Sequence, residues 1–130
     1  MLERLQQKPL GDEGDWSAFR FEVENALAWT RLAGRSEAER ELAAGMATMI
    51  AATDGRGLDS VKNAAAQLEI KERDTNGALY GLLATATKGR AHDMVRTEET
   101  GRCGVTTWVK LRDRFSKGEA SSYMDVLRFV

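Results

Sequence analysis

Cysteine, proline and long apolar runs are almost absent from this chain of 130 residues. The single cysteine, Cys103, excludes an internal disulfide and is typical of a protein that folds in a reducing compartment. The single proline, Pro9, leaves every later segment open to helix formation. The most apolar stretch, Leu42–Thr53, is too short to cross a bilayer, and the first residues lack the apolar region of a signal peptide. We therefore expect a cytoplasmic protein with no membrane partner.

An excess of either charge is also absent, because the formal net charge is −1. A nearly neutral chain is not expected to attract nucleic acid strongly over its whole surface. The charge is uneven, however, since the segment Lys88–Lys117 holds 8 basic and 4 acidic residues. The simplest interpretation of this basic region is a solvated helix face. The alternative is weak, non-specific contact with RNA phosphates through Lys88, Arg90, Lys110, Arg112 and Arg114.

Residue types that carry catalysis or bind metals are scarce. His92 is the only histidine, and its neighbour Asp93 faces another side of a helix, so a Ser-His-Asp site is not expected. One histidine and one cysteine (Cys103) cannot supply the three or four ligands of a zinc site. The run Thr53–Gly57 matches neither an aspartic protease motif nor a phosphate loop. We predict a protein that is not an enzyme, with no metal, cofactor or small-molecule substrate.

The apolar residues that are present recur at the three- and four-residue spacing of α-helices, and runs of β-branched residues are absent. Ser36 and Glu39 match the capping box that begins a helix. Asp74–Gly77 is either a break or the capping segment of the next helix, and Lys88-Gly89 either interrupts that helix or lies within it. The pattern predicts an all-α protein of five to six short-to-medium helices, over residues 15–32, 36–53, 59–73, 75–97, 107–115 and from about 120 onward.

One apolar face of each predicted helix supplies the candidate core. Phe21 and Trp29 flank the inward stripe of the first helix, and Thr106 or Thr107 is the expected cap of the segment 107–115. Trp108 shares its face with the other apolar residues of that segment, so we interpret it as a core residue rather than a base-stacking surface. The predicted core consists of Trp16, Phe19, Val23, Leu82, Leu83, Met94, Val95, Trp108, Leu111 and Phe115.

The order of these motifs resembles a known family. The motifs in chain order are Leu79-Tyr80-Gly81-Leu82-Leu83, Thr87-Lys88-Gly89-Arg90-Ala91, Met94-Val95 and, after a loop, Trp108-x-x-Leu111-x-x-x-Phe115. This set resembles the capsid-like region of the Gag polyprotein of copia-type LTR retrotransposons. The segment Trp16-Ser17-Ala18-Phe19 is similar to the start of that region. The resemblance extends from about Trp16 to Val130, and its second half is the more specific.

The resemblance implies an orthogonal, capsid-like bundle of helices and a structural role. Such a protein self-associates into particles around the RNA of the element, so its partners would be further copies of itself and, weakly, RNA. Pro9, Gly11 and Gly14 predict a flexible arm over residues 1–14, which leaves 15–130 as the helical domain. The apolar stripe that ends at Val130 leads us to expect either a domain truncated at its C-terminal end or a last helix that packs against a partner. The chain departs from full Gag in having no zinc knuckle, the module that would bind RNA specifically. A helical nucleic-acid-binding module that uses Lys88–Lys117 is the alternative function.

Overall fold

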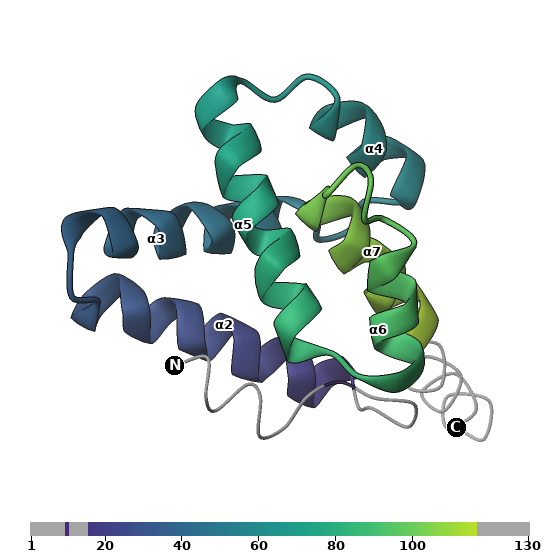
Figure 1. The fold of residues 1–130 in the computed structure, drawn as a ribbon, viewed down its shortest axis with the longest axis horizontal. Coiled ribbons are helices and arrows are strands. Elements are labelled where there is room, and N and C mark those ends of the chain that lie inside the picture. Colours follow the sequence, from purple (N-terminus) through teal and green to yellow (C-terminus); the bar gives the residue numbers. More distant parts are fainter. Residues whose placement is uncertain (1–9, 11–15, 117–130) are drawn as a thin grey trace, which may run out of the picture.

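The computed structural model describes Leu10 and residues 16–116, and within them the chain is all-α, with six helices and no strand. α2 and α3 form an antiparallel hairpin, α5 crosses it, and the remaining helices gather on the other side of α5 (Figure 1). The all-α prediction is confirmed, whereas the helix expected from residue 120 onward lies outside the described residues. The bounds are α2 Trp16–Ala33, α3 Glu37–Ala52, α4 Leu58–Ala65, α5 Ile70–Ala86, α6 Gly89–Arg96 and α7 Gly104–Phe115.

α7 is the central helix, because it contacts each of the other five described helices. Trp108 is fully buried on it, and its indole packs edge-on against that of Trp16, with ring centroids 4.8 Å apart. Among the residues predicted for the core, Met94 and Phe115 are half-buried and pack against the rest. The others are buried, namely Trp16, Phe19, Val23, Leu82, Leu83, Val95, Trp108 and Leu111.

The start of α7 lies in close contact with α5. The Asn76 side chain accepts a 2.9 Å hydrogen bond at Oδ1 from the backbone N–H of Val105. An α5 side chain thereby satisfies one of the amides that have no partner at the beginning of a helix. A Cβ atom on Gly104 would lie 2.5 Å from the Asn76 carbonyl oxygen and 2.7 Å from Leu79 Cβ. The two helices can approach this closely only because residue 104 is glycine.

The predicted N-terminal boundary of α7 is wrong. The helix begins at Gly104, so Thr106 and Thr107 lie buried in its first turn rather than at its cap. The Thr107 hydroxyl donates to the Cys103 carbonyl at 2.8 Å, which is a bond within the helix. The helix can begin earlier because the Val105 amide donates to Asn76 Oδ1. The Asn76 side chain thereby accepts from an amide of the first turn, as a serine or threonine cap would have done.

The predicted helix over residues 59–73 is also wrong, because the chain forms two helices there. α4 ends at Ala65, and α5 begins at Ile70 and continues through Asp74–Gly77. The intervening turn has no glycine or proline. It is stabilised by the Arg73 side chain, whose Nε donates a 2.7 Å hydrogen bond to the Leu68 carbonyl. A side chain of the second helix thus binds the turn that separates the two helices.

The structure confirms one local prediction and decides one alternative that the sequence left open. Ser36 Oγ accepts a 3.1 Å hydrogen bond from the Glu39 amide at the start of α3. The Glu39 carboxylate reaches back to the amide of Arg35 at 3.2 Å, as in a capping box. Lys88-Gly89 does interrupt the fourth predicted helix, since α5 ends at Ala86 and Gly89 has a positive φ of 58°.

Leu10 is bound at this break between α5 and α6. Its side chain is 1% exposed. Its amide donates to the Ala86 carbonyl at 3.1 Å, and its carbonyl accepts from the Lys88 amide at 2.9 Å. The remaining residues of the predicted arm, 1–9 and 11–14, lie outside the described part of the chain.

Candidate interaction surface

The two candidate reactive side chains, His92 and Cys103, make local contacts within the fold. His92 is half-buried, with Nδ1 3.4 Å from the Thr87 hydroxyl. Cys103 Sγ lies 3.0 Å from the Thr106 hydroxyl and 3.3 Å from the amide nitrogen of Asn76. Within Leu10 and residues 16–116, no three His, Cys, Asp or Glu side chains are grouped so that they could hold a metal ion. Nor is any helix of that part long and apolar enough to cross a membrane.

A hollow beside Cys103 is the nearest candidate for a reaction site. Its lining includes Cys103 and Glu98 together with basic side chains from α4 and α5. His92 is not among the lining residues. The structure therefore does not bring the histidine, the cysteine and a carboxylate together in this hollow.

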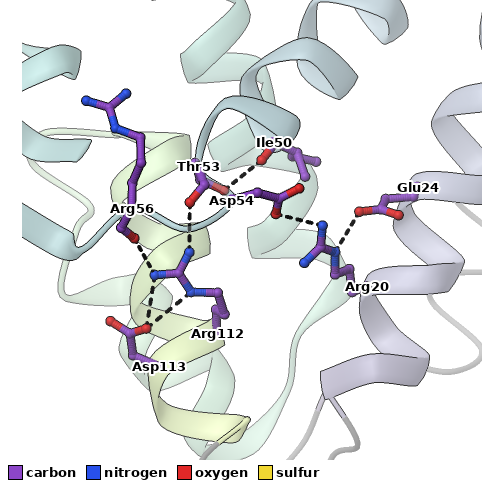
Figure 2. A network of polar contacts seen from close by, with 8 residues as sticks. All are labelled: Arg20, Glu24, Ile50, Thr53, Asp54, Arg56, Arg112 and Asp113. Atoms are coloured by element: carbon purple, nitrogen blue, oxygen red, sulfur yellow. Dashed lines mark hydrogen bonds and ion pairs between the residues drawn. The ribbon is translucent and has the colours of Figure 1, made fainter. Parts of the chain in front are cut away.

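Arg112 binds inside the fold. Its Nη1 donates to the Thr53 carbonyl at 2.9 Å and its Nη2 to the Arg56 carbonyl at 2.7 Å (Figure 2). Thr53 ends α3 and Arg56 lies in the loop that follows, where carbonyl groups have no partner within a helix. The Thr53 carbonyl also accepts from the Arg56 amide at 3.1 Å, and the guanidinium group adds a charged donor to both carbonyls. Arg112 therefore ties α7 to the end of α3.

Arg20 binds the same loop from the opposite side (Figure 2). Its Nε donates to Glu24 and its Nη2 to Asp54, each at 2.7 Å. The hydrogen bond with Glu24, assisted by that with Asp54, raises the pKa of Arg20 above its usual value. The loop between α3 and α4 is thus held by arginines from α2 and α7, and we assign both side chains a structural role.

The five predicted RNA contacts divide into two groups. Lys110 forms an ion pair with Glu98, and Arg112 binds the loop carbonyls, so both make internal contacts. Lys88, Arg90 and Arg114 are exposed. The structure therefore does not bring the five cations together on one surface. Fewer of them are exposed to solvent than the sequence of the basic region suggests.

Three of the five large apolar side chains that are exposed within the described residues lie on α2, and the other two are Leu42 on α3 and Ile70 on α5. Phe21, Trp29 and Leu32 are 64%, 66% and 80% exposed. At about 100° per residue, they and Ala28 fall within one outward sector, opposite the buried Val23, and the exposed polar Asn25 lies in the same sector. We call Phe21, Ala28, Trp29 and Leu32 the outer face of α2. This helix is therefore apolar on two opposite sides, a pattern typical of helices that are buried on both.

Sequence reasoning missed the outer face as a functional feature. It placed Phe21 and Trp29 beside the inward stripe, although helical geometry turns Phe21 almost directly away from Val23. The signal that could have found it is the helical angle of roughly 160–180° between the inward Val23 and the outward Phe21 and Leu32. A single amphipathic helix accounts for the inward or the outward set of apolar residues but not for both.

Comparisons of the chain with family models, with curated proteins and with solved structures find no match. The resemblance to copia-type Gag therefore depends on the sequence motifs alone, and the identity it implies stays a prediction.

Proposed function

We propose that this chain is a structural protein that self-associates into particles around RNA, as the resemblance to copia-type Gag implies. The observation that carries the proposal is the outer face of α2. Single exposed apolar residues need no explanation, but Phe21, Trp29 and Leu32 lie together on one rigid helix. Covering them with another copy removes apolar area from water at roughly 25 cal/mol per Å².

Weak contacts suffice for such a role. A particle repeats each contact many times, so that multivalency supplies the stability that one contact lacks. RNA would add a further link between copies, because the exposed Lys88, Arg90 and Arg114 can neutralise phosphates without reading sequence. These three cations are the residues through which we propose the RNA contact.

Sedimentation velocity over a wide concentration range, with and without single-stranded RNA, tests the proposal. We expect the mass to grow with protein concentration, and the growth to increase when RNA is added at low salt. Electron microscopy of the heaviest fractions should show closed particles. A chain that stays monomeric at the highest concentration, with RNA present, would contradict this function.

The alternative, a nucleic-acid-binding helical module, gives a different result in the same experiment. It predicts a monomer that binds RNA with an affinity that falls steeply as salt is raised. The internal contacts of Lys110 and Arg112 reduce the number of cations that this alternative can use.

A further inference from the structure

We infer that two copies of this chain pair through the outer face of α2, helix against antiparallel helix, about a two-fold axis at the level of Ala26 and Leu27. The inference rests on the proposed self-association and names the surface and the partner, a second copy of the chain. A two-fold pair uses the same patch on both copies, so the patch must be complementary to itself.

The apolar residues of the outer face satisfy this condition. With the axis between positions 26 and 27, Phe21 lies opposite Leu32 of the second copy, and Leu32 opposite its Phe21. The same axis places Asn25 opposite Ala28. α2 has 18 residues and is about 27 Å long, so these contacts spread over most of its length.

The charged residues of α2 favour the antiparallel orientation. Glu24 and Arg31 are both exposed, and because they lie two turns apart they share one edge of the outer face. In an antiparallel two-fold pair this edge faces the same edge of the other helix. Glu24 is then level with Arg31 of the second copy to within about two residues, or about 3 Å of rise, which the long side chains can span. Two opposite-charge pairs would flank the apolar centre.

A parallel pair has the opposite electrostatic consequence. In a parallel pair, the edge of α2 that holds Glu24 lies against the opposite edge of the second copy, which holds Glu22. The two residues differ in height by about two residues, or 3 Å. Two carboxylates would then approach each other on each side, and like charges disfavour that arrangement. Glu24 bonds Arg20 through Oε1, so the contact with the second copy would use Oε2.

The size of the face indicates a weak pair. From the exposed fractions of its three large side chains, each copy would bury on the order of 400–500 Å². The total of roughly 800–1,000 Å² is below the usual range of stable interfaces. The pair should therefore form and dissociate with concentration, as a repeated contact in a larger assembly would.

Trp29 is a built-in reporter of this pairing. The chain has 3 tryptophans, of which Trp16 and Trp108 are 3% and 0% exposed, whereas Trp29 is 66% exposed. Quenching of the fluorescence by iodide therefore reports chiefly on Trp29. We expect quenching to fall as protein concentration rises, over the same range in which sedimentation shows the mass to double.

Charge reversal tests the orientation. Glu24→Arg alone and Arg31→Glu alone should each raise the dissociation constant about tenfold, because each change affects both flanking pairs. The double variant should return to within about threefold of the original chain, since it exchanges the two charges. Phe21→Ser should raise the constant at least about 30-fold. The matched control is Ile70→Ser, which removes a side chain that is 77% exposed on α5 and should change nothing.

Circular dichroism and urea unfolding establish that each variant is folded. If the chain self-associates but Phe21→Ser and both reversals leave it unaffected, the inference is overturned and the proposed function stands. If Trp29 is already shielded in a monomer, another part of the same chain covers the face and the pairing is wrong. If Trp29 stays accessible and the chain stays monomeric with RNA, the pairing and the proposed function both fail.

Discussion

Replacing Gly104 by alanine should destabilise the fold, while replacing Gly81 by alanine should stabilise it. The added Cβ at position 104 would lie 2.5 Å from a backbone oxygen of Asn76 and 2.7 Å from Leu79 Cβ. A backbone atom within α5 cannot rotate away, so α5 and α7 must separate. Overpacking of this kind costs about 1–3 kcal/mol. Alanine at Gly81, also in a helix, meets no described atom within 4 Å.

The two substitutions differ in their intrinsic effect on helix formation, because Gly81 lies inside α5 whereas Gly104 is the first residue of α7, where the gain is smaller. Glycine is less favourable than alanine in a helix interior by about 0.5–1 kcal/mol. Gly81→Ala should gain about that amount. For Gly104→Ala the clash should exceed the gain and leave a net loss of about 2 kcal/mol. Gly81→Ala therefore sets an upper limit on the propensity gain at position 104, and a loss of stability in Gly104→Ala reports the contact between α5 and α7.

Urea unfolding, followed by circular dichroism and by fluorescence, measures both changes. With a slope of about 1–3 kcal/mol per molar urea, Gly104→Ala should lower the midpoint by roughly 1–2 M. The slope itself should stay constant if both states keep their compactness. If Gly104→Ala is as stable as the original chain, helices α5 and α7 do not approach as closely as described, and the reasoning is refuted.

Three further substitutions test individual side chains. Arg112→Ala should lower the free energy of unfolding by about 2–3 kcal/mol, measured in urea, because two carbonyls lose a charged donor. The control Arg114→Ala removes an exposed side chain and should cost less than about 0.5 kcal/mol. Equal costs for the two variants would contradict the role of Arg112. Asn76→Ala should lower the free energy of unfolding by about 1–3 kcal/mol because the Val105 amide loses its acceptor. Asn76→Asp should keep most of the stability, since it retains an acceptor oxygen at the start of α7. Equal losses of stability in the two variants would argue against the cap. Lys88→Glu should weaken RNA binding and reduce its salt dependence by about one unit of slope, measured by fluorescence anisotropy at several salt concentrations, and an unchanged slope would remove Lys88 from the contact.

Features encoded by neighbouring residues could be predicted from the sequence. The capping box at Ser36 and Glu39 is a local device, and the hydrogen bonds of α3 reproduce it. The inward stripe of the helix predicted over residues 107–115 follows from spacing alone, and Trp108 is indeed buried. The all-α class follows for the same reason, because helix periodicity needs only a few residues to be visible.

Features that depend on distant residues could not be predicted. The start of α7 is set by Asn76, 29 positions upstream of the amide it binds. From the sequence, Arg112 is expected to be a surface cation. Only its hydrogen bonds to carbonyls 56 and 59 positions away show that it binds the loop between α3 and α4. Tertiary contacts overrule local preference at each of these places.

The central position of α7 has a consequence for biosynthesis. Five described helices precede it in the chain, and every one of them contacts it. During translation they leave the ribosome first, and their buried faces have no common partner until Trp108 and Leu111 emerge. A nascent chain that stops before Gly104 would expose those faces together and become a substrate for chaperones or proteases. We therefore expect this helical domain to complete its folding only after α7 has left the ribosome.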